Sequence, residues 1–270
     1  EEKTFAATLE DHGQTFDRMA ALEDVFSRFR PDSQLSRLNA TGALSDPNPE
    51  LKTVLTKAVA YGDLTGGAFD VTVEAVLKHY RTAAQTGTLP ADDQLRAAQQ
   101  LVDYRQIAIH EDAIRLNLPG MAVTLDGIAK GYIIDAGAAV LRAHGCDQVM
   151  VELGGDLQTY GSADAQPWQV SIQAPPGSAS QRVAQLVNRA LATSGDYQYR
   201  FTPDRRLHHI LDPHRGVSPD ELSSASVIAP TVCDADALAT ALMVMGAEAG
   251  QEIRSEEHTS ELQSPCNLVC

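Results

Sequence analysis

The sequence predicts an α+β fold, with an antiparallel or mixed sheet at its core and helices flanking it. In the N-terminal part of the chain, apolar side chains recur three and four positions apart, which is typical of amphipathic helices. After residue 105 the pattern changes to short apolar runs separated by turn residues, which is typical of successive strands. Because helices and antiparallel strands are largely segregated along the chain, we expect a single domain over residues 1–253.

Helices are expected where the apolar spacing is helical and a turn or glycine ends it. These segments cover residues 14–29, 51–61, 72–80, 92–100, 128–144 and 232–245, the last two ended by Gly145 and Gly246. Between the first two segments, residues 31–36 are turn-like, and Asp32 or Ser33 can cap a short helix there. Residues 42–49 contain many turn-forming residues and are expected to form a loop.

Strands are expected where short apolar runs lie between turn residues. These segments cover residues 106–110, 113–118, 121–125, 148–153, 156–160, 168–173, 189–194, 207–211 and 224–229. Residues 174–181 are small or polar and are expected to form a flexible connector inside the same domain. The last residues, 254–270, show neither a helical nor a strand period. We therefore expect them to be a non-native tail outside the domain.

The composition excludes two classes of partner. The formal net charge is −15, and a surface of that charge repels nucleic acid and anionic membranes. No run approaches the roughly 20 apolar residues that span a bilayer. Outside the tail only Cys146 and Cys233 remain, which is too few to indicate a disulfide framework. We therefore expect neither nucleic-acid binding nor a membrane span in this chain.

Two glycine-containing segments are candidates for ligand contact. Residues 66–72 hold a glycine pair, which lets the backbone approach a ligand closely, but Asp70 or Thr72 can instead simply cap a helix. Residues 124–132 join a strand to a helix through a glycine turn and carry Lys130. Helix N-terminal amides beside a lysine suit a phosphate group. A purely structural junction is the alternative.

Two polar segments are candidates for catalysis and metal binding. Residues 208–216 carry three histidines, and the pKa of histidine suits proton transfer near neutral pH, although surface histidines in a turn are the plainer interpretation. Asp236 and Thr240 lie four residues apart and therefore share one helix face. Carboxylate and hydroxyl oxygens are ligands that magnesium prefers. Capping of the helix by Asp234 or Asp236 is the alternative.

Taken in order, seven short motifs resemble the pattern of the ApbE family of FAD:protein FMN transferases. They are residues 33–39 (SQLSRLN), 67–72 (GAFDVT), 127–135 (GIAKGYIID), 153–156 (LGGD), 194–197 (SGDY), 209–216 (HILDPHRG) and 236–240 (DALAT). The resemblance implies an ApbE-like fold related to the T-fold. It also implies a family domain that continues beyond the last helix, so we expect the C-terminal end to be truncated.

The resemblance implies a role for each matching residue. FAD lies in a cleft with Mg²⁺ on its pyrophosphate, and the metal is held by the Gly127 carbonyl, Asp236 and Thr240. His209 is the implied general base. The other implied FAD contacts are Phe29, Ala68, Phe69, Asp70, Thr124 and Lys130. The family often has aspartate where this chain has Thr124, and Asp126, two residues later, is a candidate substitute.

The implied reaction is Mg²⁺-dependent transfer of FMN from FAD to a threonine or serine hydroxyl of an acceptor protein, with release of AMP. Family acceptors are redox proteins at the outer face of the bacterial inner membrane, which implies a periplasmic location. Two further hypotheses use the same site: a FAD pyrophosphatase that yields FMN and AMP, and a non-catalytic flavin-binding protein. A fourth hypothesis is an interaction protein that has the fold but does not bind FAD.

Overall fold

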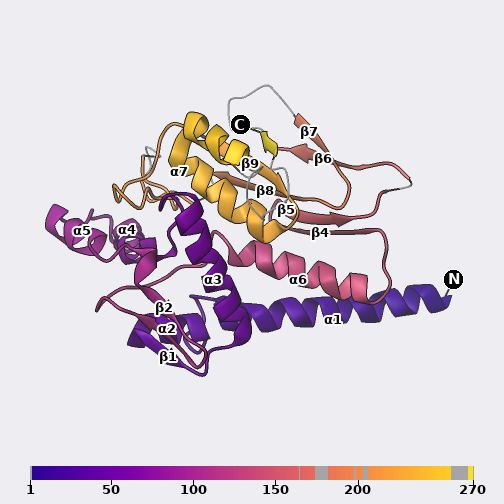
Figure 1. The fold of residues 1–270 in the computed structure, drawn as a ribbon, viewed down its shortest axis with the longest axis horizontal. Coiled ribbons are helices and arrows are strands. Elements are labelled where there is room, and N and C mark those ends of the chain that lie inside the picture. Colours follow the sequence, from indigo (N-terminus) through magenta and orange to yellow (C-terminus); the bar gives the residue numbers. More distant parts are fainter. Residues whose placement is uncertain are drawn as a thin grey trace.

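The computed structural model describes residues 2–163, 165–173, 182–197, 199–202, 206–256 and 267–269. An antiparallel five-stranded sheet and a layer of long helices form the larger part of the molecule (Figure 1). A smaller part contains a three-stranded sheet with shorter helices around it (Figure 1). This arrangement of helices and antiparallel strands confirms the α+β class that the sequence predicts.

Every neighbouring pair in the five-stranded sheet is antiparallel. In spatial order its strands are β10 (Asn267–Val269), β9 (Ser224–Ala229), β8 (Ala190–Gly195), β5 (Asp156–Tyr160) and β4 (Val149–Leu153). A separate hairpin is formed by β6 (Trp168–Ile172) and β7 (Arg182–Leu186). β10 lies inside the segment expected to be a tail without strand character, so three residues of that segment do pair with β9.

Two long helices cover the sheet and a third covers one of them. α6 (Ala129–Ala143) and α7 (Val232–Glu256) pack on the strands and on each other, and α1 (Glu2–Phe26) packs along α6 (Figure 1). The helix predicted from residue 232 ends at Gly246 as expected, but a further helical stretch, which was not predicted, follows it. Gly246 has φ 79° and ψ 177°, so the helix breaks there and then resumes. None of the described helices is long and apolar enough to cross a lipid bilayer.

The smaller part begins with α2 (Gln34–Thr41), whose N-cap is Ser33: its hydroxyl accepts a hydrogen bond from the Ser36 N–H at 2.9 Å. The strand order of its sheet is β1-β3-β2. Its other elements are β1 (Ala43–Ser45), α3 (Pro49–Leu64), η1 (Val71–Val73), α4 (Glu74–Thr86), α5 (Asp92–Gln99), η2 (Tyr104–Gln106), β2 (Ile107–Ile109) and β3 (Ala113–Leu116). One apolar core joins both parts and includes the fully buried Leu51, Ile128 and Met243.

Several elements differ from the sequence prediction. Residues 121–125 were expected to be a strand, but the Val123 N–H bonds to the Asn39 side chain instead of a neighbouring strand. Residues 207–211 make only a single bridge, because the His208 N–H bonds to the Ser218 hydroxyl. The loop expected at residues 42–49 contains β1, and β7 was not predicted. The connector at residues 174–181 lies outside the described residues.

Candidate functional site

The helices α6 and α7 cross with their main chains in contact. Gly131 lies at the crossing: a Cβ atom there would lie 2.6 Å from the Val232 carbonyl carbon and 2.7 Å from the Cys233 nitrogen. Only glycine allows this approach without displacement. One turn later on α6, the Asp135 carboxylate accepts hydrogen bonds from the N–H groups of Val232 and Cys233 at 2.8 and 2.9 Å, and so caps α7. These two α6 residues therefore fix where α7 begins.

The crossing brings the three predicted metal ligands together. A Cβ atom on Gly127 would lie 3.0 Å from the Thr240 Oγ1, so the turn before α6 touches α7. Asp236, one turn before Thr240, is buried, and its Oδ2 accepts a hydrogen bond from the Gly131 N–H at 3.2 Å. The Thr240 hydroxyl lies 3.2 Å from the Ser194 hydroxyl at the end of β8. Metal binding by these residues stays a prediction, but their positions suit it.

A metal ion at this crossing would have only one carboxylate ligand. Among the described residues, no group of three or more His, Cys, Asp or Glu is placed to hold a metal ion. A cation at the crossing would therefore depend on main-chain and hydroxyl oxygens besides one carboxylate. Hard cations such as Mg²⁺ accept this mixture, because all of these ligands are oxygens.

Three charged side chains meet beside the crossing. The Lys130 ammonium lies 2.7 Å from Asp156 Oδ2, and the Asp156 side chain is only 1% exposed. Burial alone would lower the pKa of Lys130, but the charges of Asp236 and Asp156 outweigh burial and raise it. Burial and the charge of Asp156 raise the pKa of Asp236 to about 7, against the opposing effect of Lys130. Two carboxylates beside one ammonium leave excess negative charge, which a bound cation would neutralise.

The surroundings of His209, the predicted base, favour the neutral form of its ring. Its main-chain N–H donates to the Tyr199 carbonyl at 3.0 Å, and its ring Nδ1 lies 3.3 Å from the same oxygen. Because a carbonyl oxygen only accepts, we assign the ring proton to Nδ1, which leaves the Nε2 lone pair free. Burial is the largest cause that lowers the pKa of His209, and the neighbouring charges of His208 and Lys130 lower it further. His209 is therefore neutral at pH 7, and its role as the base stays a prediction.

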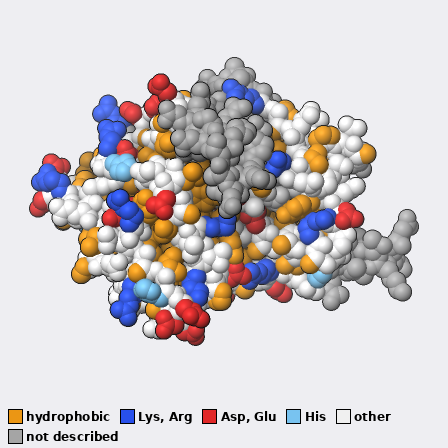
Figure 2. Space-filling view, viewed as in Figure 1, with side chains coloured by type: hydrophobic (Ala, Val, Ile, Leu, Met, Phe, Trp, Pro, Cys, Tyr) orange, Lys and Arg blue, Asp and Glu red, His pale blue; other side chains and the backbone are white. Residues whose placement is uncertain are grey.

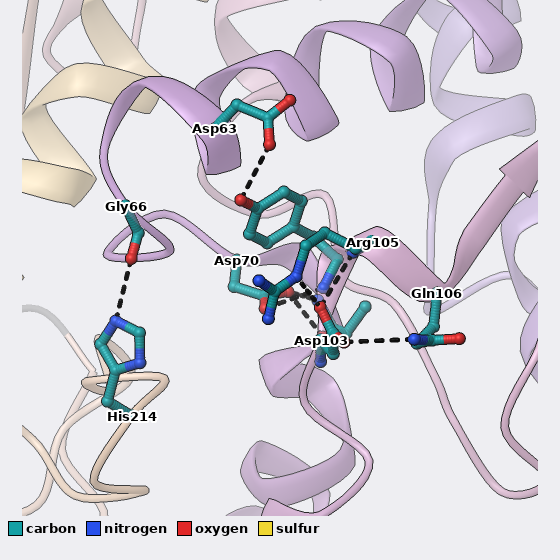
Figure 3. Close-up of polar contacts among 9 residues, drawn as sticks. Asp63, Gly66, Asp70, Asp103, Arg105, Gln106 and His214 are labelled. Carbon is teal, nitrogen blue, oxygen red and sulfur yellow. Dashed lines mark hydrogen bonds and ion pairs between the residues drawn. The ribbon is translucent and has the colours of Figure 1, made fainter.

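The other two histidines of this segment have structural contacts. His208 is buried, and its Nε2 lies 3.0 Å from the Pro219 carbonyl. The His214 Nε2 lies 3.1 Å from the Gly66 carbonyl (Figure 3). That contact ties the segment after His209 to the glycine turn at residues 66–67. The plainer interpretation, a surface histidine in a turn, therefore fits the exposed His214 but not the buried His208.

Asp70 has the contacts of a capping residue. Its Oδ1 accepts hydrogen bonds from the Thr72 N–H at 2.8 Å and from the Thr72 hydroxyl at 2.6 Å. Its Oδ2 accepts a third from the Tyr104 N–H at 3.0 Å, among the polar contacts drawn in Figure 3. Burial raises the pKa of Asp70, although these hydrogen bonds oppose the change. The capping alternative thus explains its contacts in the structure, and its contact with FAD stays a prediction.

The remaining predicted contacts surround the turn that holds Gly127. Ala68 and Phe69 are buried, and the Phe69 ring lies 3.4 Å from the Cβ position of Gly127. Thr124 lies on the other side of the turn, and its N–H donates to the Val71 carbonyl at 2.8 Å. These residues therefore lie close to the turn, and their contact with FAD stays a prediction.

Asn39 bonds to the segment before the turn, and Phe29 is exposed beside Arg28. The Asn39 side chain donates to the Val123 carbonyl at 2.8 Å and accepts from its N–H at 2.7 Å. Phe29 is 76% exposed, with the Arg28 guanidinium 4.0 Å from its ring centroid. Arg28 in turn forms an ion pair with Asp126 at 2.8 Å. Asp126, the candidate substitute for the aspartate that the family often has at position 124, is therefore paired with an arginine.

A cleft of about 750 Å³ lies next to this region. It is lined by residues 39–42 at the end of α2, by Glu74 and Lys78 of α4, and by residues 116–122. The predicted site residues are not among its lining residues, although Ala122 precedes Thr124 by two positions. In the space-filling view of one face, lysine, arginine and acidic side chains lie among apolar ones without one dominant patch (Figure 2). The candidate site is therefore identified by the side chains at the α6–α7 crossing and not by this cleft.

Four functional candidates were quoted within motifs but received no role from the sequence. They are Asn39, Asp135, Asp156 and Ser194, which hold the turn, the α7 N-terminus, Lys130 and Thr240 respectively. Their presence in short motifs was the available signal. Their partners lie between 26 and 97 positions away in the sequence, so only the fold reveals the contacts.

Comparisons with known proteins agree with these motifs. A family model described as the ApbE family matches residues 3–263. A FAD:protein FMN transferase of Vibrio cholerae is 34% identical over 244 residues, which is 86% of this chain and 72% of that protein. One of Escherichia coli K12 is 30% identical over 265 residues, which is 93% of this chain and 75% of that protein.

Solved structures show the same likeness. The apo flavinyl transferase ApbE of Pseudomonas stutzeri superposes with a TM-score of 0.83 at 28% identity, covering 93% of this chain and 81% of that one. The flavin transferase ApbE of Vibrio cholerae superposes with a TM-score of 0.80 at 28% identity, covering 100% of this chain and 88% of that one.

Proposed function

The chain belongs to the ApbE family, and from this membership we propose that it transfers FMN from FAD to a threonine or serine hydroxyl of an acceptor protein and releases AMP. Its relatives are named FAD:protein FMN transferases, which makes it a transferase with FAD as the donor and a protein as the acceptor. Magnesium, the hydroxyl acceptor and AMP are the finer parts of the proposal. The observation that carries it is the contact of Gly127 with Thr240, beside Asp236 and Lys130.

The crossing suits magnesium for two reasons. The Gly127 carbonyl, the Asp236 carboxylate and the Thr240 hydroxyl are all hard oxygen donors, and these would hold the ion. Asp236 and Asp156 together carry more negative charge than Lys130 balances, which favours a bound cation. When bound there, magnesium supplies positive charge that neutralises the pyrophosphate oxygens.

The start of α6 provides the second positive element. Ile128, the N-cap residue of α6, makes no capping hydrogen bond through its side chain. In the first turn, the Gly131 N–H donates to Asp236 Oδ2. Helix N-terminal amides attract phosphate, and the Lys130 ammonium adds a full positive charge in that turn. Phosphoryl transfer depends mainly on such positioning and charge stabilisation. We therefore place the FAD diphosphate at the N-terminal end of α6, beside Lys130.

His209 provides the base. As the acceptor hydroxyl oxygen forms a bond to the FMN-side phosphorus, its proton passes to the His209 Nε2, and the bond from that phosphorus to the AMP oxygen breaks. The free Nε2 and the lowered pKa of His209 support this role. General-base assistance of this kind contributes about 10²–10⁴-fold to a rate. Phe29, exposed at the edge of the site, offers a flat aromatic face for the flavin ring.

The test combines the chain with FAD, Mg²⁺ and a candidate acceptor protein. Flavin fluorescence that stays on the acceptor in a denaturing gel, together with AMP in equal amount, would support the transferase. An acceptor in which the target threonine is replaced by valine should remain dark. Rapid AMP release without any acceptor would instead establish the pyrophosphatase. Tight FAD binding without AMP, unchanged by His209→Ala, would establish a flavin-binding protein.

A further inference from the structure

One buried carboxylate, Asp156, has so far been given only a share in the negative charge that favours a cation. Asp156 is the first residue of β5, directly after the Gly154–Gly155 turn, and its side chain is 1% exposed. Its Oδ1 accepts a hydrogen bond from the Thr193 N–H of the neighbouring strand β8 at 3.0 Å. Its Oδ2 lies 2.7 Å from the Lys130 ammonium. The carboxylate is thus anchored to the sheet on one side and holds the lysine of α6 on the other.

An alternative partner for Lys130 lies close by. Asp236 interacts electrostatically with Lys130 and is almost completely buried. A buried ammonium is costly without a paired anion, so a Lys130 without Asp156 would turn to Asp236. That pairing would put an ammonium on a carboxylate that the proposed function assigns to the metal. Asp156 therefore determines in which direction the Lys130 ammonium points, and it keeps the Asp236 carboxylate free to bind the metal.

We propose that Asp156 is a positioning residue, which holds Lys130 toward the diphosphate and away from the metal-binding carboxylate Asp236. This inference rests on the proposed function and adds a residue to it. The Lys130 side chain stays 33% exposed, so it remains accessible on the side away from Asp156. Asp156 itself is shielded from solvent, so in this proposal it acts through Lys130.

The first experiment replaces Asp156 by asparagine, which keeps the shape and an oxygen for the Thr193 N–H but removes the charge. For Asp156→Asn we expect kcat of AMP release to fall about 10–100-fold, because a displaced catalytic charge loses most of its effect. We expect the KM for FAD to change less than about threefold, and the Mg²⁺ concentration for half-maximal rate to rise about tenfold. Loss of packing alone would not produce this combination.

A matched control removes a carboxylate that has a similar ion pair but no burial. Asp147 lies 3.0 Å from Arg142, and its side chain is 90% exposed. Asp147→Asn should leave kcat, the KM for FAD and the Mg²⁺ requirement unchanged. A wild-type kcat and Mg²⁺ requirement in Asp156→Asn would overturn the inference.

A double-mutant cycle decides whether Asp156 acts through Lys130. In the Lys130→Met background, adding Asp156→Asn should change kcat less than about twofold, because the residue that it positions is already gone. A further fall as large as that in the wild type would overturn the inference. If Asp156→Asn does not fold, the double variant, which removes both charges of the pair, is compared with Lys130→Met by the same criterion. Absence of AMP from the wild type with any acceptor would instead refute the proposed function itself.

Discussion

Replacing Gly131 by alanine tests whether main-chain contact between α6 and α7 builds the site. The added Cβ would lie 2.6 Å from the Val232 carbonyl carbon, whereas ordinary contact between carbon atoms begins near about 3.5 Å. The helices must therefore separate by roughly 1 Å, because the obstructing atoms, which are the Val232 carbonyl and the Cys233 nitrogen, belong to the main chain and cannot rotate away.

The expected cost has two opposing parts. Overpacking at a rigid contact costs about 1–3 kcal/mol, and the higher helix propensity of alanine returns about 1 kcal/mol. We therefore expect a net loss of about 0–2 kcal/mol in the free energy of unfolding. The effect on rate is larger, since a shift of about 1 Å in catalytic groups costs about 100-fold. Urea unfolding followed by tyrosine and tryptophan fluorescence and a chromatographic assay for AMP measure the two effects.

Gly137→Ala is the matched control in the same helix. Its Cβ would lie 2.9 Å from the Met19 sulfur, which is the flexible end of a side chain and can move aside. We expect its AMP release within about twofold of the wild type and its stability within about 1 kcal/mol. Equal loss of activity in both variants, or wild-type activity in Gly131→Ala, would refute the reasoning from the crossing.

Three further predictions concern residues that hold the site. Asp135→Ala leaves two N–H groups at the start of α7 without their acceptor, so urea unfolding should show a loss of about 2–4 kcal/mol; a loss below 1 kcal/mol would contradict the capping role. Asn39→Ala removes both hydrogen bonds to Val123 and should lower stability by about 1–3 kcal/mol, with less effect for Asn39→Asp, which keeps one acceptor; equal losses would speak against a two-sided clasp. The lowered pKa of His209 means that protonation, and with it loss of kcat, sets in only below pH 6.5, the ordinary value for histidine; a pH–rate profile whose acid limb lies above that value would exclude His209 as the base.

The sequence predicted the helices better than the strands, because helix signals are local. Residues 51–61 and 92–100 became α3 and α5 with shifts of a few positions, since apolar spacing, caps and glycines all lie within the segment. The strand expected at residues 121–125 did not form, because Asn39 satisfies Val123 from 84 positions away. Such a contact has no signature in the local pattern.

For the candidate site, the sequence indicated three residues that the fold brings together, but not the residues that support them. The motif order and helical spacing pointed to Gly127, Asp236 and Thr240, and the fold places all three at one crossing. The supporting residues were not predicted, because their partners come from distant strands and helices. Asp156 reaches Lys130 only after β5 and α6 have packed, and no spacing in the sequence indicates that pair.

The break at Gly246 divides α7 into two helical lengths. The Glu221 carboxylate occupies the space beside Gly246 and accepts a hydrogen bond from the Ala247 N–H at 2.9 Å, so the second length has its own anchor. Asp236 and Thr240 belong to the first length, which Asp135 fixes from the other end. In an unbroken helix, a displacement of the C-terminal residues would be passed on to these two residues. At a glycine break, a change in the Gly246 φ and ψ angles can take up such a displacement. Fusion partners or labels attached beyond the break should therefore leave the geometry at the crossing undisturbed.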